Sequence, residues 1–277
     1  DDLTERLAAT TRTFTAAAVL NDPTGEIAPA LINFNKLSSD ATLIAGDLSP
    51  VILNPLSTAG TAFVCDEETL PLAPASLDLI VSVLSLHKLN DIPGALVQMR
   101  RALKPDGLLL ASLFGAATLS ELRAAFLHAE AERGASPRVA PFPDVRDMGA
   151  LLQRAGFALP VADADQVTVT YATPFDLMRD LRAMGETNAL AARRKTVTAR
   201  TTFVEMAKCY ADLSAKADGR IPATFEILNI TAWAPAPSQP QPLKPGSAQT
   251  RLADALGTTE TPLPKDSAPV DPGDREE

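Results

Sequence analysis

The sequence predicts an α/β protein built on a mostly parallel, doubly wound sheet. Residues 77–84 form an apolar run, rich in β-branched residues, that is typical of a strand buried on both faces. Apolar side chains then recur at helical spacing over 95–103. After Lys-Pro-Asp-Gly at 104–107, whose glycine permits a turn, we expect a second buried strand over 108–113. Strand, helix and strand in this order make a βαβ unit, which implies parallel strands covered by helices on both faces.

The remaining elements follow from local patterns. Asp144 is expected to cap a helix that runs to Arg154, and Gly156 to end it. Residues 166–171 alternate between large apolar side chains and threonine, which is typical of a half-buried strand. The sequence further predicts helices over 3–13, 27–31, 118–134, 174–184 and 198–214, and strands over 16–20, 41–46, 61–65, 157–161 and 224–233, the last one antiparallel to its neighbours.

Composition limits the classes of protein to consider. A chain of 277 residues, 46% of them hydrophobic, can bury one substantial core. A net charge of -9 argues against sequence-independent binding of nucleic acid. Cys65 and Cys209 lie far apart and indicate a reducing compartment, with a disulfide as the alternative. No apolar run approaches the roughly 20 residues of a membrane helix, so we expect no transmembrane segment.

The composition of the chain changes at about residue 235. We expect one domain over 1–234, with a helical insertion over about 174–218 before the last strand. Residues 235–277 hold nine of the 23 prolines and few large apolar side chains, which predicts an extended or flexible tail with a short helix over 251–256. The chain begins with Asp1 and has no initiator methionine, so its start is expected to be a transit-peptide cleavage site or an artificial boundary.

Several motifs of this chain occur together in one known family. The segment 66–107 holds closely spaced acids before Leu-Pro, then Asp-Leu-Ile-Val-Ser, Leu-His, Asn-Asp and Leu-Lys-Pro-Asp-Gly. In this order the motifs resemble class I S-adenosylmethionine (SAM) methyltransferases. They are most similar to the branch of mitochondrial complex I assembly factor 5 and its bacterial homologues, a relative of the biotin-pathway malonyl-carrier methyltransferase. Segments starting at Ser136, Thr168 and Gly219 fit this branch too. The resemblance implies a Rossmann-like sheet of seven strands.

The family's glycine-rich loop after the first strand is altered here. The resemblance places Asn21 and Pro23 where two glycines are expected, keeps Gly25, and puts Val19 in place of an acid. Proline has no N–H to donate and fixes its own φ, which is a defect for a loop that wraps a cofactor. Asp22 could accept a hydrogen bond from the ammonium of the ligand; the alternative is an ordinary Asn-Asp-Pro turn.

Other candidate cofactor contacts follow the next strands. Asp47, beside Leu48, ends the second strand, where one carboxylate can accept from both hydroxyls of a ribose; the alternative is an N-cap. The resemblance places the acid for the adenine amino group at Asp66, beside Glu67, whereas three consecutive acids can also be a solvated loop. Two further candidates stand at the carboxyl end of the fourth strand, where ligands bind in open α/β sheets: Ser82 and Val83.

The sequence defines the substrate side of the site less clearly than the cofactor side. His87 is a weak candidate for a catalytic base, because histidine titrates near neutral pH; the alternative is a histidine packed beside the cleft. Lys88 stands where the family commonly has tryptophan, which alters what the pocket can enclose. The insertion is rich in arginine and lysine, from Arg179 to Arg200, and could accept an acidic partner or a carboxylate; the alternative is a solvated helical face. We predict no metal site.

The resemblance therefore implies SAM as the cofactor if the site functions, and none otherwise. It also implies a protein partner among respiratory complex I subunits or assembly intermediates, in the mitochondrial matrix or at the inner membrane, or else a place in the bacterial cytoplasm. We therefore expect a methyltransferase-fold protein of the complex I assembly-factor type, and the degenerate loop at Asn21 and Pro23 makes a catalytically silent pseudoenzyme, serving as a partner-bound subunit or scaffold, one of its two possible forms. The alternative is an active methyltransferase, or a protein-arginine hydroxylase of the same family, acting on a protein or a small carboxylate.

Overall fold

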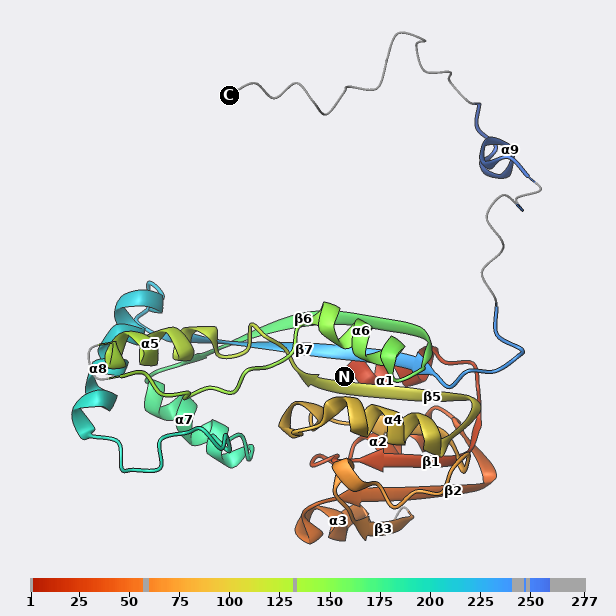
Figure 1. Ribbon diagram of the computed structural model, residues 1–277, viewed down its shortest axis with the longest axis horizontal. Coiled ribbons are helices and arrows are strands. Elements are labelled where there is room, and N and C mark those ends of the chain that lie inside the picture. Colours follow the sequence, from red (N-terminus) through yellow and green to blue (C-terminus); the bar gives the residue numbers. More distant parts are fainter. Residues whose placement is uncertain (1, 57–59, 132–133, 241–246, 248–249, 260–277) are drawn as a thin grey trace. The chain divides into compact units, whose positions relative to one another are not determined.

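The computed structural model describes residues 2–56, 60–131, 134–240, 247 and 250–259. Within them, seven strands form one sheet in the order β3-β2-β1-β4-β5-β7-β6 (Figure 1). All neighbouring strands are parallel except at β7, which is antiparallel to both β5 and β6. The predicted α/β class, the seven-stranded, mostly parallel sheet and the antiparallel last strand are confirmed.

The bounds of the elements agree with most of the predicted ones. The strands are β1 (Phe14–Leu20), β2 (Leu37–Asp47), β3 (Thr61–Val64), β4 (Leu77–Ser82), β5 (Leu103–Phe114), β6 (Ala158–Tyr171) and β7 (Ile221–Trp233). The helices are α1 (Asp2–Ala9), α2 (Ile27–Asn33), α3 (Pro50–Leu56), α4 (Ile92–Ala102), α5 (Ser120–Glu130), α6 (Val145–Arg154), α7 (Pro174–Ala183), α8 (Arg200–Ser214) and α9 (Leu252–Leu256), with short 3₁₀ turns η1 (Glu67–Thr69) and η2 (Leu86–Lys88).

Helices cover both faces of the sheet, as the apolar run of β4 predicts. On one face, Leu79 and Val81 of β4 pack with Leu7 of α1 and Leu31 of α2. On the opposite face, Ile80 joins a cluster with α4 and α6. Leu79, Ile80 and Val81 are fully buried, and each contributes roughly 1.5–3 kcal/mol relative to an exposed position. The core therefore fixes the strands whose carboxyl ends carry the candidate site.

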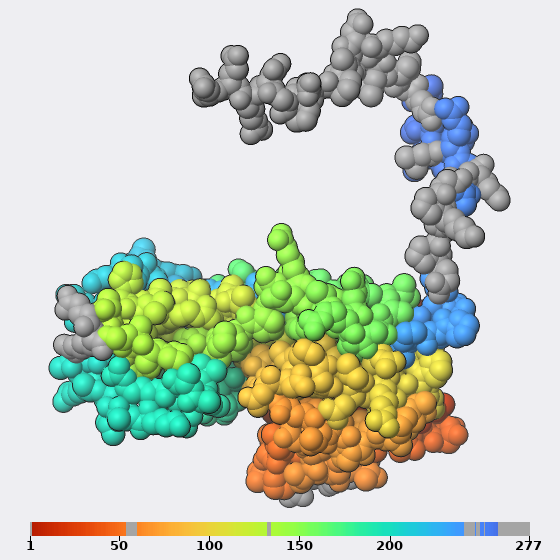
Figure 2. Space-filling model, viewed as in Figure 1, coloured from red at the N-terminus to blue at the C-terminus, as the bar shows by residue number. Residues whose placement is uncertain are grey.

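A third apolar cluster lies beyond the carboxyl end of β5. It joins Phe114 of β5 and Phe225 of β7 to α5, α7 and α8 (Figure 1). Figure 2 shows the insertion, coloured teal, beside the yellow region of α4. Tyr210 of α8 is fully buried in this cluster and donates a hydrogen bond to the carbonyl of Pro222 at 2.8 Å. The insertion before the last strand thus has a core of its own, continuous with the end of the sheet.

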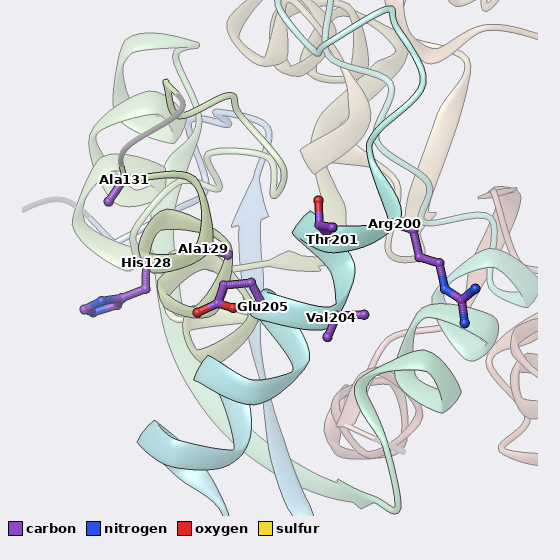
Figure 3. A pocket seen from close by; sticks show the side chains of 7 residues that line it. All are labelled: His128, Ala129, Ala131, Arg200, Thr201, Val204 and Glu205. Carbon is purple, nitrogen blue, oxygen red and sulfur yellow. The ribbon is translucent and has the colours of Figure 1, made fainter.

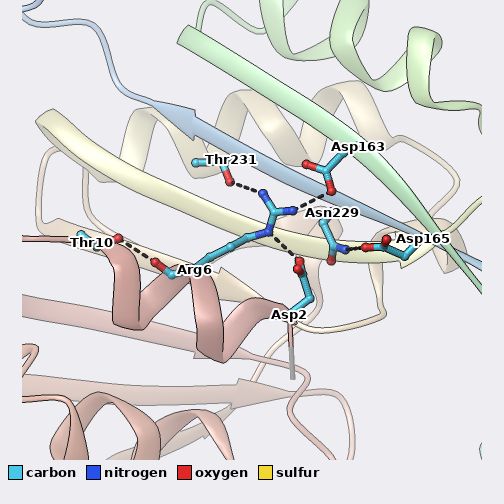
Figure 4. Close-up of polar contacts among 7 residues, drawn as sticks. All are labelled: Asp2, Arg6, Thr10, Asp163, Asp165, Asn229 and Thr231. Carbon is cyan, nitrogen blue, oxygen red and sulfur yellow. Dashed lines mark hydrogen bonds and ion pairs between the residues drawn. The ribbon is translucent and has the colours of Figure 1, made fainter.

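Helix α1 is tied to the sheet by Arg6 (Figure 4). The guanidinium donates to Asp2 of the same helix and to Asp163 of β6, each at 2.6 Å, and reaches Thr231 of β7 at 3.4 Å. Asp165, which lies nearby, accepts from the amide of a β7 asparagine. These contacts join the first helix to the last two strands of the chain.

Five local expectations need correction. The first helix, α1, ends at Ala9 and not at residue 13. In the Lys104–Gly107 segment, Asp106 and not Gly107 takes the positive φ, of 65°, and the segment is counted within β5. The two short strands expected over 157–161 and 166–171 are one long strand, β6, because β7 pairs with it along that length. The alternation over 166–171 does not bury its valines, since β6 is an edge strand. Helix α5 begins at Ser120, after Leu119 at φ 54°, and not at Thr118.

The chain divides into two units, 1–237 and 238–277. Most of the expected tail, 235–277, lies outside the described residues, although the short helix expected near its middle is present as α9. The predicted boundary at 234/235 stays a prediction. Cys65 and Cys209 are free thiols, so the disulfide alternative is wrong. Among the described residues, no helix combines the length and the apolar character needed to cross a bilayer.

Candidate functional site

Two residues of the loop after β1 have a positive φ, the conformation that glycine adopts most easily. Asn21 has φ 53°, in the left-handed region that asparagine tolerates better than most residues. The backbone N–H of Asn21 donates to the carbonyl of Gly46 at 2.8 Å, and its side-chain amide donates to the carbonyl of Val83 at 2.9 Å. Gly25 also has a positive φ, of 69°. The substitution at the first glycine position is therefore compatible with the turn, whereas Pro23 still removes one donor.

Asp22 is used within the loop itself. Its carboxylate is almost fully buried and accepts from the N–H of Gly25 and of Ile27, each at 3.0 Å, and from the hydroxyl of Thr24 at 2.9 Å. These bonds satisfy the start of α2, as the ordinary-turn alternative expects. A role of Asp22 toward a ligand ammonium stays a prediction.

Asp47 carries a buried oxygen that lacks a partner. The residue is 4% exposed, and its Oδ1 accepts from the N–H of Ser49 at 2.6 Å. Its Oδ2 makes no hydrogen bond with any described residue. A buried polar atom of this kind costs free energy unless a donor reaches it. The carboxyl end of β2 is therefore suited to the hydroxyl groups of a ribose, and the neighbouring Leu48, 66% exposed, leaves that end open.

The acids after β3 are not a solvated loop. Asp66 accepts from the N–H of Glu68 and so caps η1. Glu67 is buried and accepts from the hydroxyl of Ser82 at 2.8 Å, and Ser82 also lies 2.8 Å from the hydroxyl of Ser85. Burial raises the pKa of Glu67; hydrogen bonds from the two serines oppose this rise, and the charges of neighbouring aspartates add to it.

The carboxyl ends of β2, β3 and β4 thus form one acidic site. Burial, together with the negative charges of Glu67, Asp47 and Asp66, raises the pKa of the Cys65 thiol to about 11. The thiol is therefore neutral and packed in the core. A site of this charge favours a ligand that carries net positive charge. Val83 adds its backbone, whose carbonyl holds Asn21.

A cavity of about 360 Å³ lies beyond the ends of β4 and β5. The side chain of His87 is 1% exposed, and its ring packs against Phe114 and Phe142, with ring centroids 4.7 and 5.6 Å apart. The N–H of Phe114 donates to Nδ1 of His87 at 3.3 Å, so Nδ1 is unprotonated and Nε2 carries the hydrogen. His87 is thus packed beside the cleft with both ring nitrogens engaged, and its role as a base stays a prediction.

Sequence reasoning missed the residue that faces His87. Glu186 follows α7 in the insertion; its Oε2 lies 3.4 Å from Nε2 of His87 and its Oε1 lies 2.9 Å from Nζ of Lys88. Burial opposes ionisation of Glu186, but the hydrogen bonds from His87 and Lys88 outweigh it and hold its pKa below the usual value. Gly185 before it was visible as a helix stop, but no local pattern pairs position 186 with position 87.

A buried ion pair supports one wall of the cavity. Glu130, at the end of α5, is 2% exposed, and it pairs with Arg138 and accepts from the N–H of Ser136 at 3.1 Å. Arg138 also donates to the hydroxyl of Thr198 at 2.9 Å. The segment that carries Phe142 is therefore fixed to both α5 and the insertion, and the charge of Arg138 is neutralised within the wall.

A larger hollow, of about 720 Å³, lies between α5 and α8. In Figure 3, the two basic side chains of this hollow do not converge, because His128 and Arg200 point away from each other. A binding site needs a few convergent polar groups. The carboxyl edge of the sheet and the cavity beside it are therefore the candidate site.

The chain is similar to known proteins over most of its length. A family model described as "Methyltransferase domain" matches residues 24–111. Arginine-hydroxylase NDUFAF5, mitochondrial, of Danio rerio is 41% identical over 217 residues, 76% of this chain and 67% of that protein. Malonyl-[acyl-carrier protein] O-methyltransferase of Xylella fastidiosa is 46% identical over 170 residues, 61% of this chain and 56% of that protein.

The fold is also that of solved methyltransferases. Phosphoethanolamine N-methyltransferase 2 of Haemonchus contortus, in complex with S-adenosylhomocysteine, superposes with a TM-score of 0.51 at 18% identity, over 85% of this chain and 52% of that one. The chain spans about two thirds of the length of the zebrafish relative and less of the Xylella one. On these identities and lengths, the chain belongs to the class I SAM-dependent methyltransferase superfamily, in the branch that holds the NDUFAF5 proteins and their malonyl-carrier relatives.

Proposed function

We propose that the chain binds SAM at the carboxyl edge of β1 to β4 and acts on an arginine side chain of a partner protein held in the adjacent cavity. The observation that carries the SAM site is the buried, unpartnered Oδ2 of Asp47 at the end of β2. A ribose hydroxyl would satisfy that oxygen, which otherwise costs free energy in the folded state.

The residues at this edge fit the parts of the cofactor. Asp47 would accept from the ribose hydroxyls, and Asp66 from the adenine amino group. The loop from Asn21 to Gly25 would lie along the methionine part, with Ser82 and Val83 beneath it. SAM has net positive charge and supplies an electrophilic methyl group on its sulfonium sulfur, and the acidic edge favours that charge.

The class of substrate is proposed from the relatives. The NDUFAF5 proteins are named as arginine hydroxylases, and others of the branch as O-methyltransferases of a malonyl carrier. A complex I subunit or assembly intermediate is the proposed partner for the first activity. The second candidate is the silent scaffold, which Pro23 favours because it removes a backbone donor from the loop.

Isothermal titration with SAM and with S-adenosylhomocysteine tests the cofactor site. We expect micromolar binding to the full chain, and about 10- to 100-fold weaker binding after Asp47→Ala, the loss expected for a hydrogen bond to a charged group. Asp40→Ala is the matched control, because Asp40 is exposed near the other end of the same strand. Absence of binding of both ligands, by calorimetry and by equilibrium dialysis, would refute the cofactor site and leave the scaffold as the candidate. Equal affinities for Asp47→Ala and the unmodified chain would remove Asp47 from the site.

A further inference from the structure

One ion pair lies in the lining of the cavity beside the cofactor edge. Nζ of Lys88 lies 2.9 Å from Oε1 of Glu186, and the two side chains differ in exposure, 40% against 16%. Lys88 belongs to η2, after β4, and Glu186 to the insertion, so their contact bridges the sheet and its cover. The lysine can swing into solvent on its flexible stem, whereas the carboxylate is held inside.

The backbone keeps Glu186 in place. At the end of α7, the N–H of Glu186 donates to the carbonyl of Leu181 at 2.8 Å, and Gly185 has φ 76°. This is the glycine-terminated arrangement that fixes the first residues after a helix. His87 adds a second restraint, because its Nε2–H faces the other carboxylate oxygen. The position of this negative charge is therefore determined by the fold and not by Lys88.

The rest of the cavity lining would favour a cation in place of Lys88. Arg138 is neutralised by Glu130, and His87 is a neutral donor, so the carboxylate of Glu186 is the unbalanced charge once Lys88 leaves. The rings of Phe114 and Phe142 lie 6.0 Å apart within the same wall, and aromatic faces attract cations. An anion could bind Lys88 only by displacing the carboxylate of Glu186 from it, and Glu186 is the more buried residue of the pair.

We propose that the Lys88 ammonium occupies the substrate's position at Glu186, and that a guanidinium side chain displaces this ammonium and binds Glu186. This inference rests on the proposed function and names the residue that selects its substrate. Glu186 is the specificity determinant, because a planar guanidinium can pair with a carboxylate through two N–H groups and stack on a phenylalanine ring. Lys88 is a competitor that keeps the carboxylate paired when no substrate is present.

Two variants should have opposite effects on binding. The probe is the tripeptide acetyl-Gly-Arg-Gly-amide, titrated by calorimetry into the full chain with S-adenosylhomocysteine present. Lys88→Met removes the competitor and should tighten binding up to about fivefold, the worth of a partly exposed ion pair. Glu186→Gln keeps the shape and the hydrogen bond from His87 but loses the charge, and should weaken binding at least about tenfold.

The control is an ion pair with the same N–O distance at the amino ends of β4 and β5, away from the cavity. Lys104 and Asp78 lie 2.9 Å apart with exposures of 38% and 17%, close to the values of Lys88 and Glu186. Lys104→Met should leave the affinity for the tripeptide unchanged. The citrulline tripeptide should bind at least about tenfold more weakly than the arginine one, because it has the shape without the charge.

The remaining outcomes overturn the inference. If malonate binds and Lys88→Met abolishes that binding, the cavity takes an anion and Lys88 is its receptor. If Glu186→Gln binds the arginine peptide as the unmodified chain does, Glu186 does not select the substrate. Titration of SAM into the same variants without S-adenosylhomocysteine separates these failures from failure of the cofactor proposal, and equal melting temperatures show that each variant is folded.

Discussion

Removal of the cation from the buried pair of Arg138 and Glu130 should destabilise the domain strongly. In Arg138→Met the side chain keeps its packing against Phe126, over whose ring the guanidinium lies at 5.3 Å, but Glu130 loses its counter-ion. The residue Glu130 is 2% exposed, so water cannot replace the missing charge. Breaking a buried pair in this way costs about 3–5 kcal/mol, and the lower end applies because the Arg138 side chain is 14% exposed.

This loss of unfolding free energy can be measured as a fall in the melting temperature. For a unit of the size of residues 1–237, a loss of about 3 kcal/mol lowers the melting temperature by about 6–12 °C. Differential scanning calorimetry of Arg138→Met, Glu130→Gln and the double variant measures it. We expect the double variant to be no less stable than Arg138→Met, because the unpaired charge is gone. A fall of less than about 2 °C in Arg138→Met, or additive losses in the double variant, would refute the reasoning.

Three further predictions concern the acids and the loop. Burial raises the pKa of Glu67, so the stabilisation from its protonated form is present below its unfolded pKa and is lost as pH rises through its folded pKa. Glu67→Gln should therefore raise the melting temperature more at pH 8 than at pH 5. An equal rise at both pH values would contradict this prediction. Burial opposes ionisation of Asp78, but hydrogen bonds from Thr15 and Lys104 lower its pKa from 3.8 to about 2. Urea unfolding of Asp78→Asn should therefore show a loss of roughly 2 kcal/mol at pH 7 that shrinks below pH 4, and a loss independent of pH would count against it. Asn21→Gly should retain SAM affinity and Asn21→Val should reduce it, as measured by calorimetry, because valine rarely adopts φ 53°; equal affinities would contradict this.

The sheet could be predicted because its pattern is local. The apolar run of β4 requires cover on both faces, and the packing of Leu79 and Val81 on one side and of Ile80 on the other shows why residues 79–81 are all apolar. The strand order also places the end of β2, and so Asp47, at the edge where open α/β sheets bind ligands. That reasoning needs no side-chain geometry.

The acceptor cavity could not be predicted in the same way. His87 and Glu186 are 99 positions apart, and only the packing of the insertion on the sheet brings them together. The length of β6 likewise depends on its pairing with β7, since its own sequence has no continuous strand pattern. Asn21 differs from both cases, because asparagine tolerates the left-handed region better than most residues and the sequence alone shows this compatibility with the turn.

The most direct test of the account is a crystal structure of the chain grown with saturating S-adenosylhomocysteine. The account predicts the ribose hydroxyls within hydrogen-bond distance of Oδ2 of Asp47, with the loop around Asn21 keeping its backbone shape. A crystal without the ligand, or with its ribose seated away from Asp47, would contradict it.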